Sequence, residues 1–332
     1  MGTEKHMIHS GQHTPRPQTG LVVDDIFLKH FKQPEHPESP VRLLAIESEL
    51  RRRGLIDRVK LVPVRLGTPE ELTLAHDLEY VERVRDACAS QSYPIHFDGA
   101  WMCPSTYEVA ASAVGTSIDL ATAVATGELA NGFSLVRPPG HHAERDRYSG
   151  FCYFCTPAIV ALNLVENIGI KRVFLLDLDY HGGNGTQHAL SSDPRVYYCS
   201  IHGDPKFAFP HDSGYKSERG EGAGFGFTKN VPLPADTDDA MYLAAFDEEV
   251  MPVFKAYDPE IVLLSMGFDL LKEDPIGRFN VSSEALLRVT EKVCQIAREH
   301  CGGRVVSILE GGYNPGVMAL AVADHVDLLL KS

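Results

Sequence analysis

The chain has 332 residues, of which 44% are hydrophobic, and a formal net charge of −14. This length fits one large α/β domain or two ordinary ones, and the apolar content is sufficient for a large core. The acidic balance argues against a general nucleic-acid-binding protein, because such a protein needs basic side chains to neutralise phosphates. The seven cysteines are an odd number scattered along the chain, which indicates free thiols in a reducing compartment.

The first residues of the chain are polar. Residues 1–18 lack the long apolar run of a signal peptide, and no later segment is apolar over the length needed to span a bilayer. No internal repeat or low-complexity linker divides the remainder. We therefore expect a flexible N-terminal tail over residues 1–18, one domain over residues 19–332, a cytoplasmic location and no membrane partner.

Short apolar runs alternate with longer amphipathic stretches along the domain. The runs predict seven strands, which lie in the segments 19–25, 59–64, 132–140, 173–181, 196–203, 261–269 and 305–313. The amphipathic stretches predict helices over 105–126, 155–168, 238–257 and 283–300. Because apolar, non-alternating strands separated by helices are typical of a sheet covered on both faces, we expect a single-domain, three-layer α/β/α fold with a mostly parallel central sheet.

Polar side chains stand where four of these strands end. In parallel α/β sheets, ligands bind beyond the carboxyl ends of the strands, so these side chains are candidate site residues. They are His141 and His142, then Asp177, Asp179 and His181, then Asp269, and finally Tyr313. Together they predict one rim at which aspartates, histidines and a tyrosine meet.

Three of these side chains form a candidate metal site. Asp179 and His181 are two residues apart, so they leave the strand on the same side and can share one ion, and Asp269 can supply a third ligand. Two carboxylates and one histidine leave an open position for water and substrate, as catalytic zinc requires. Taken alone, an Asp-x-His pair is more often a buried hydrogen bond. Glycines and leucines follow His181 and Asp269, so the carboxylates suffice for one metal, which argues against a binuclear manganese site.

Several segments resemble the zinc-dependent histone deacetylase family, in the branch shared by class II enzymes and bacterial acetylpolyamine amidohydrolases. They are "RPPGHHAERDRYSGFCYF", "DLDYHGGNGTQ", "GFDLLKEDPIG" and "LEGGYN", preceded by "HPESPVR" and "CPST". The resemblance covers about residues 19–330 in the family's order. It implies the arginase/deacetylase fold, one zinc ion per chain and hydrolysis of amide bonds.

The resemblance also implies roles for the strand-end residues. Asp179, His181 and Asp269 resemble the zinc ligands, and His141, His142 and Tyr313 the catalytic histidine pair and the transition-state tyrosine. Asp177 resembles the residue that orients His141. Asn184 stands where class I enzymes carry an aspartate behind His142, and an amide oxygen there still accepts the Nδ1 proton. In the implied mechanism zinc-bound water attacks the amide, His142 transfers protons and Tyr313 stabilises the oxyanion.

Two further groups of residues follow from the resemblance. A structural potassium ion, or another monovalent cation, is implied at Asp177, Asp179, His181, Ser200 and Ile201. The substrate channel is implied at Asp98, Gly150, Phe151, Phe209 and Ile276. Without the motif order, Tyr313, Phe151 and Phe209 would more simply be packing residues.

The substrate stays open between two classes. Ile276 stands where the polyamine-selective class II member carries a glutamate, which removes one anchor for a distal ammonium and favours an acylated lysine side chain. Segment 200–225 resembles acetylpolyamine amidohydrolases and favours a small acylated amine, as do four acids that can line an entrance, Asp24, Asp25, Glu35 and Glu38. We expect a broad bacterial deacylase of lysine-like amines, with acetylpolyamines second and a non-catalytic acyl-binding protein third. Segment 24–40 is a candidate contact of a homo-oligomer or a candidate loop that closes the pocket.

Overall fold

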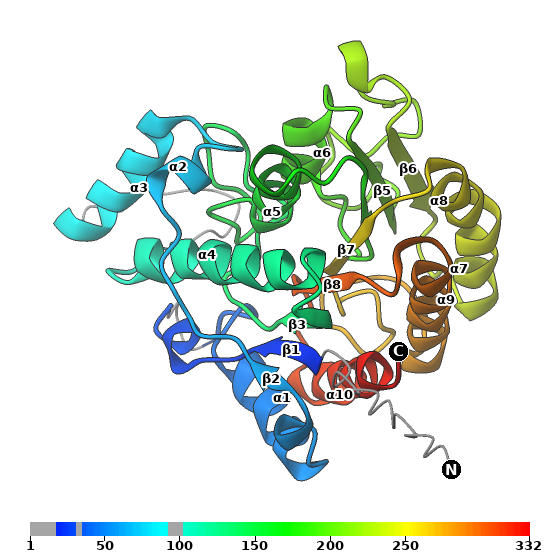
Figure 1. Ribbon diagram of the computed structural model, residues 1–332, viewed down its shortest axis with the longest axis horizontal. Coiled ribbons are helices and arrows are strands. Elements are labelled where there is room, and N and C mark those ends of the chain that lie inside the picture. The colour runs from blue at the N-terminus through cyan, green and yellow to red at the C-terminus, as the bar shows by residue number, and fades with distance from the viewer. Residues whose placement is uncertain (1–17, 31–34, 92–101) are drawn as a thin grey trace, which may run out of the picture.

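The computed structural model describes residues 18–30, 35–91 and 102–332. Within these ranges a single sheet of eight parallel strands forms the centre of the molecule, in the order β2-β1-β3-β8-β7-β4-β5-β6 (Figure 1). The strands are β1 (Gln18–Val22), β2 (Lys60–Leu61), β3 (Leu129–Ser134), β4 (Val173–Asp177), β5 (Val196–Gly203), β6 (Thr228–Leu233), β7 (Ile261–Met266) and β8 (Val305–Leu309).

Helices connect the strands. The α-helices are α1 (Val41–Arg52), α2 (Pro69–Leu72), α3 (Leu78–Ser90), α4 (Thr106–Ala125), α5 (Thr156–Asn163), α6 (Asn184–Leu190), α7 (Asp239–Ala245), α8 (Met251–Tyr257), α9 (Ser283–Cys301) and α10 (Pro315–Lys331). The short 3₁₀ segments are η1 (Asp25–Leu28), η2 (Ile56–Arg58) and η4 (Gly222–Gly224). Two π-helical turns continue longer helices, η3 (Leu164–Ile168) after α5 and η5 (Phe246–Val250) after α7.

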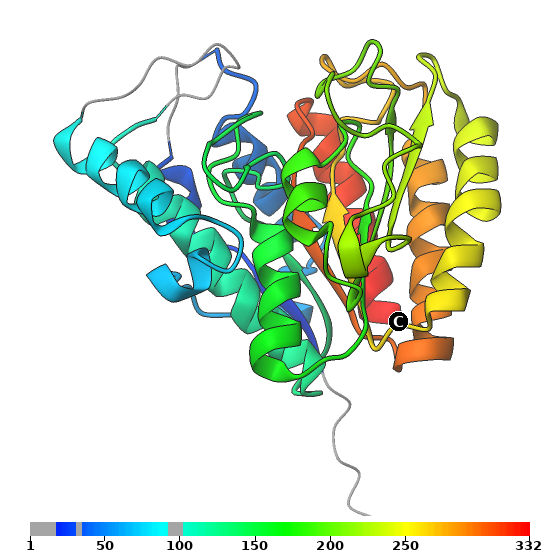
Figure 2. The same cartoon turned by 90° about the horizontal axis from the view of Figure 1, so that it is seen from above.

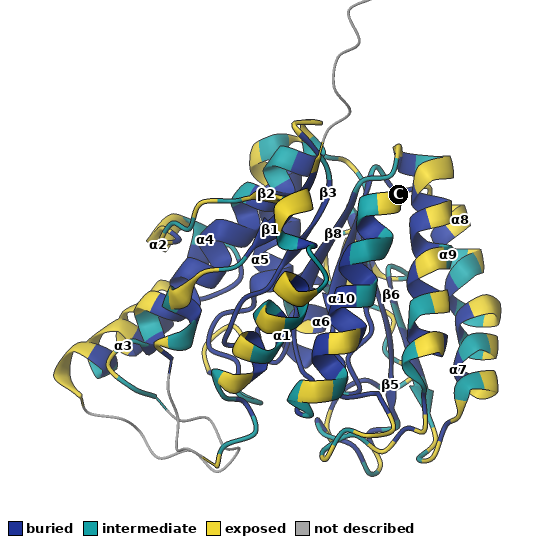
Figure 3. Cartoon of the chain, turned by 90° about the horizontal axis from the view of Figure 1, so that it is seen from below, coloured by how far each residue is buried: buried dark blue, intermediate teal, exposed yellow. Residues whose placement is uncertain are grey.

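The helices form one layer on each face of the sheet. Helices α4, α5 and α6 contact strands of one face, whereas α10 and α9 contact strands of the other, with α1 packed against α10. Figure 2 shows α3 (cyan) at one end of the molecule and α8 and α9 (yellow and orange) side by side at the other. The central strands are buried between helices whose exposed residues lie on their outer surfaces, whereas both residues of the edge strand β2 are exposed (Figure 3). The predicted three-layer α/β/α fold is therefore confirmed, and the described sheet is wholly parallel.

The central strands are apolar because both of their faces are covered. Every residue of β4 ("VFLLD"), β7 ("IVLLSM") and β8 ("VVSIL") is buried, as expected for parallel strands between two helix layers. Strand β4 lies between β5 and β7, and β8 lies beside β7. This order brings the carboxyl ends of strands that are far apart in the chain to one place.

The seven predicted strand segments contain β2, β4, β5, β7 and β8 and overlap β1 and β3, which begin earlier, at Gln18 and Leu129. The eighth strand, β6, was not predicted. Its sequence "TKNVPL" has no continuous apolar run and contains Pro232, which cannot donate a hydrogen bond to a sheet. A proline is tolerated because β6 is the last strand of the sheet and pairs only with β5.

The four predicted helical stretches are helical. The side chain of Ser282 caps α9 by accepting a hydrogen bond from the amide of Ala285, a contact that typically contributes about 1 kcal/mol to stability. The stretch 238–257 is divided into α7, η5 and α8. The predicted tail lies outside the described residues apart from Gln18, which begins β1.

All seven cysteines are free, in agreement with the sequence. Across the described ranges, the structure contains no helix that is both long enough and apolar enough to cross a membrane.

Candidate active site

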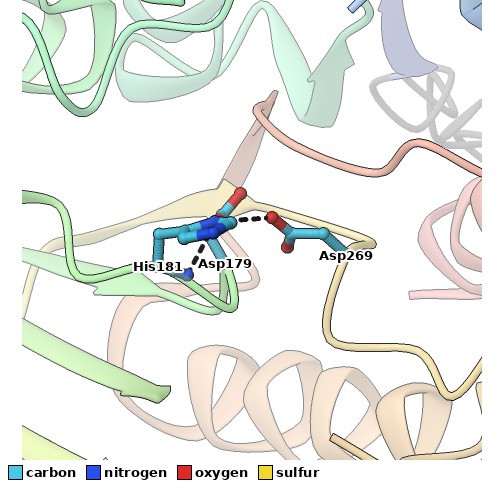
Figure 4. Close-up of side chains that lie close together, drawn as sticks. All are labelled: Asp179, His181 and Asp269. Carbon is cyan, nitrogen blue, oxygen red and sulfur yellow. Dashed lines mark hydrogen bonds and ion pairs between the residues drawn. The ribbon is translucent and has the colours of Figure 1, made fainter. Parts of the chain in front are cut away.

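Asp179, His181 and Asp269 converge beyond the carboxyl ends of β4 and β7. Nδ1 of His181 lies 3.2 Å from Oδ1 of Asp179 and 2.9 Å from Oδ2 of Asp269. Figure 4 shows that Asp269 reaches the imidazole from a separate segment of the chain. Among the residues that the structure describes, this is the one group of three metal-competent side chains whose ligand atoms all lie within 4.8 Å of one another.

Backbone amides orient both carboxylates. Asp179 accepts hydrogen bonds from the amides of His181 (2.9 Å) and Gly311 (2.8 Å), and Asp269 accepts one from the amide of Tyr180 (2.9 Å). A Cβ atom at Gly311 would lie 2.6 Å from Oδ2 of each aspartate, so glycine leaves the space that the carboxylates occupy. Burial and the charge of Asp179 raise the pKa of Asp269 to about 7.

These donors fit a zinc ion. Two carboxylates buried side by side repel each other, and a cation between them would relieve the repulsion. Two aspartates and one histidine also leave a coordination position open, which is the arrangement of catalytic rather than structural zinc.

The histidine pair follows β3 on a buried loop. The rings of His141 and His142 are 4.0 Å apart between centroids. Nδ1 of His141 lies 3.1 Å from Oδ2 of Asp177, and Nδ1 of His142 lies 2.7 Å from Oδ1 of Asn184. Burial alone would lower the pKa of His141, but the negative charges of two neighbouring aspartates raise it to about 10. Burial and the positive charges of two neighbouring histidines lower the pKa of His142 well below its usual range.

Sequence reasoning missed Glu310, a buried carboxylate that holds this loop. Its Oε2 accepts hydrogen bonds from the amides of Gly140 (2.6 Å) and His141 (3.1 Å), and its Oε1 accepts one from the hydroxyl of Ser265 (3.2 Å). Burial raises its pKa to about 7. The available signal was a charged residue directly after the apolar strand "VVSIL", the same pattern that identified the other site residues.

Tyr313 is positioned by two further residues that the sequence did not single out. Its amide donates to Oδ2 of Asp274 at 2.6 Å, and the guanidinium carbon of Arg42 lies 5.2 Å from its ring centroid. Arg42 also donates to the carbonyls of Glu310 (2.5 Å) and Gly312 (2.6 Å), which lie on the same loop. Burial raises the pKa of Tyr313 well above its usual value, so its hydroxyl stays protonated.

A cavity of about 210 Å³ leads to these groups. Its lining residues are His142, Gly150, Phe151, His181, Phe209, Ile276 and Tyr313. All seven were predicted from the sequence as site residues. Of the five residues predicted for the substrate channel, Asp98 lies outside the described residues.

The residues predicted for a monovalent cation lie on β5 and at or just beyond the end of the neighbouring strand β4. Asp177 at the end of β4 is the register partner of Ser200 in β5, and Ile201 follows directly. Oδ1 of Asp177 accepts a hydrogen bond from the amide of Asp179 at 3.1 Å, and the hydroxyl of Ser200 lies 2.7 Å from Nδ1 of His202. The structure thus brings these residues together, and the ion itself stays a prediction.

One of the four predicted entrance acids is in the wrong place for that role. Glu38 is completely buried, and its Oε1 lies 2.5 Å from Nε of Arg137 and 3.5 Å from Nη1 of Arg42. A carboxylate held in the interior by two guanidinium groups stabilises the fold and does not line an entrance. Asp24, Asp25 and Glu35 are exposed.

Fold and site together define the class of this protein: a parallel α/β/α protein with a candidate mononuclear metal centre at the carboxyl ends of its strands. Residues 36–329 match the histone deacetylase domain. The structure superimposes on the crystal structure of the HDA15 HD domain with a TM-score of 0.89 and 33% identity, covering 96% of this chain and 89% of that one. The chain belongs to the histone deacetylase family, which confirms the predicted family and fold.

Three relatives indicate the breadth of this family. The chain is 33% identical to human histone deacetylase 9, over 99% of this chain and 37% of that protein. It is 37% identical to human polyamine deacetylase HDAC10, over 88% of this chain and 44% of that protein. It is 35% identical to a probable deacetylase of Archaeoglobus fulgidus, over 89% of this chain and 81% of that protein. The chain spans less than half the length of these two human relatives.

Proposed function

We propose that this protein is a zinc-dependent amide hydrolase that removes acyl groups from lysine side chains or lysine-like amines. The observation that carries the proposal is the cavity, because its lining combines the polar side chains of His142, His181 and Tyr313 with the apolar rings of Phe151 and Phe209. An aliphatic acylated amine fits an apolar lining, and its carbonyl would meet the polar groups. Family membership supports the same reaction class. The catalytic domain in this proposal is residues 19–332.

The metal ligands in this proposal are Asp179, His181 and Asp269. Zinc there would polarise the amide carbonyl and lower the pKa of a bound water toward about 7. The hydroxyl of Tyr313, which burial keeps protonated, donates a hydrogen bond to the carbonyl oxygen as that oxygen gains negative charge.

The two histidines have different tasks. Nδ1 of His142 is paired with the amide oxygen of Asn184, which leaves Nε2 to accept a proton from the attacking water and to return one to the leaving amine. His141, held by Asp177, adds positive charge beside the reacting atoms. The charged partner Asp177 thus favours a protonated His141, whereas the uncharged partner Asn184 leaves His142 able to accept a proton.

Acylated lysine is the first substrate class and a small acetylated polyamine the second. Ile276 lines the cavity with an apolar side chain, which offers no partner to a second ammonium group. The polyamine alternative is supported by the 37% identity to a relative named as a polyamine deacetylase.

We further propose a structural potassium ion beside the zinc ligands. The register pair of Asp177 and Ser200 supports it, because a carboxylate and a hydroxyl oxygen are brought together in a buried place. The cytoplasmic location and the homo-oligomer stay predictions from the sequence.

A rate panel with the purified, zinc-loaded chain tests the reaction and the substrate class. It compares acetyl-, longer-acyl- and trifluoroacetyl-lysine peptides with acetylputrescine, acetylcadaverine and acetylspermidine. We expect the highest kcat/KM on an acyl-lysine peptide. A large excess of kcat/KM for the free amines would reverse the order of the two substrate classes. If none of these amides is hydrolysed, the proposed enzymatic activity is refuted and a non-catalytic acyl-binding protein is favoured.

A further inference from the structure

The amide of Asn184 bridges two buried side chains, His142 and Glu144. Its Oδ1 lies 2.7 Å from Nδ1 of His142, and its Nδ2 donates to Oε1 of Glu144 at 2.6 Å. All three residues are at least 94% buried. The histidine, the amide and the carboxylate therefore form one line of hydrogen bonds that leads away from the cavity.

Glu144 decides which way this amide points. An amide accepts at one end and donates at the other, whereas an ionised carboxylate only accepts. With Glu144 on its far side, Asn184 must turn its NH₂ group outward and its oxygen toward the imidazole. Nδ1 of His142 must then carry the proton, which leaves Nε2 unprotonated.

The carboxylate of Glu144 is itself held as an acceptor. Nδ1 of His188 lies 2.9 Å from each of its oxygens, and the guanidinium of Arg147 lies 3.7 Å from Oε1. Burial alone would raise the pKa of Glu144, but the hydrogen bond and the charge of His188 lower it, so the group stays ionised. Nδ2 of Asn184 and the side chains of His188 and Arg147 all lie near Oε1, and a carboxylate oxygen can accept from more than one donor.

The backbone brings these side chains within reach of one another. The amide of Thr186 in α6 donates to the carbonyl of His141 at 3.1 Å, and a Cβ atom at Gly185 would lie only 2.1 Å from the carbonyl oxygen of Ala143. The start of α6 is therefore packed directly against the segment that contains His142 and Glu144. This packing places the side chain of Asn184 between those of His142 and Glu144.

We propose that Glu144 is a positioning residue that acts through Asn184 to select the tautomer of His142. This inference rests on the proposed function, in which Nε2 of His142 must accept a proton. Glu144 thus orients His142 as a directly bonded carboxylate would. Because the amide of Asn184 stands between them, the full negative charge of Glu144 does not contact the imidazole.

Three substitutions distinguish the effect of Glu144 on the orientation of Asn184 from the effect of its charge and from a general loss of folding. Glu144→Ala removes the acceptor, so the amide of Asn184 can turn over. Glu144→Gln keeps an oxygen that can accept from Asn184 but removes the charge. Arg147→Ala is the matched control, because Arg147 touches the same carboxylate from the solvent side, where 61% of its side chain is exposed.

We expect kcat to fall by about 10-fold or more in Glu144→Ala, with KM nearly unchanged, because the wrong tautomer removes the base but not the binding site. Glu144→Gln should retain most of the activity, and Arg147→Ala should equal the wild type. Equal kcat in Glu144→Ala and the wild type would overturn the proposal, and so would an equal loss in Glu144→Ala and Glu144→Gln.

A pair exchange covers the case in which Glu144→Ala does not fold. Asn184→Asp alone places two buried carboxylates in direct contact and should lose activity. Adding Glu144→Gln gives the new aspartate an NH₂ donor on its outer side, so the double variant should be at least about 10-fold more active than Asn184→Asp. A double variant no better than the single one contradicts the proposal.

A readout that needs no turnover distinguishes this proposal from the proposed function. In ¹⁵N-edited NMR spectra of the zinc-loaded protein, His142 should show a protonated Nδ1 in the wild type and in Glu144→Gln. Glu144→Ala should show a mixture of tautomers. An unchanged Nδ1–H tautomer in Glu144→Ala overturns the positioning role, even if the wild type hydrolyses no amide. A wild type that is inactive but shows the expected tautomers refutes only the proposed function.

Discussion

Nδ1 of His181 lies 2.9 Å from Oδ2 of Asp269, although 88 residues separate them in the chain. The two side chains meet because β4 and β7 are neighbours in the parallel sheet, with Asp177 opposite Ser265 at their carboxyl ends. Each residue follows its strand by only a few positions, so the sheet itself brings the proposed metal ligands together.

Asp269→Asn should remove zinc. The substitution keeps the shape of the side chain but takes away one of the two negative charges that we expect to bind the ion. We expect the zinc content, measured by mass spectrometry of the metal, to fall from about one ion per chain to near zero, together with the activity. Glu273→Gln, on an exposed side chain in the same loop, is the control. Full zinc occupancy in Asp269→Asn would exclude this ligand.

Tyr313→Phe should lower kcat and leave zinc in place. The phenol is proposed to donate to the developing oxyanion, and loss of such a donor typically costs about 10²–10³ in rate. Tyr257→Phe removes a hydroxyl that contacts the carbonyl of Pro194, so it should leave kcat unchanged. Wild-type turnover in Tyr313→Phe would show that the proposed oxyanion donor is wrong.

Ile276→Glu should shift specificity toward polyamines. A carboxylate at the cavity wall would attract the distal ammonium of an acetylpolyamine, and about 1.4 kcal/mol of such attraction is a tenfold change. We expect the ratio of kcat/KM for acetylputrescine to that for acetyl-lysine peptide to rise by about 10-fold. Ile276→Gln is polar but uncharged and controls for shape. An equal shift in both variants would mean that charge is not the cause.

Gly311→Ala should disrupt the site. The added methyl group would lie 2.6 Å from Oδ2 of Asp179 and of Asp269, closer than carbon and oxygen can approach. We expect zinc to be lost and the free energy of unfolding to fall by about 1–3 kcal/mol, as for other overpacked sites. Gly316→Ala, where the nearest atom lies 3.7 Å away, should be tolerated. Calorimetry and zinc content check both variants, and an intact zinc site in Gly311→Ala would contradict the prediction.

The contact between His188 and Glu144 should make stability depend on pH. The hydrogen bond to Glu144 raises the pKa of His188 above 6.5, and that of Glu144 is lowered below 4.5. The contribution of this ion pair to the free energy of unfolding is therefore complete between pH 4.5 and 6.5. It is lost as pH rises through the raised pKa of His188 or falls through the lowered pKa of Glu144.

Urea unfolding of His188→Ala checks this dependence. Because the side chain of His188 is 49% exposed, its loss should cost less than about 1 kcal/mol. The cost should be larger at about pH 5.5 than at about pH 9. An equal or larger cost at the higher pH would mean that the charged pair does not stabilise the fold.

Not every contact of the site could be predicted. Glu144 stands in a polar segment, and its contact with Asn184 joins residues 40 positions apart. Glu38 was expected at an entrance because nothing in its neighbourhood indicates that Arg137, 99 residues away, pairs with it in the interior. Such ion pairs depend on the folding of separate segments, and a sequence pattern reports only on nearby residues.

The sequence alone predicted seven of the eight described strands, four helical stretches, the three-layer fold and the side chains that stand at the strand ends. These features follow from the local sequence, because buried parallel strands are mostly apolar and the site residues stand at or just beyond their carboxyl ends. The tertiary structure alone decided the strand order, the edge position of β6 and the contacts that Glu144, Glu310, Arg42 and Asp274 make around the site. Those depend on which distant segments pack together, and that choice is made by the burial and hydrogen bonding of the whole chain.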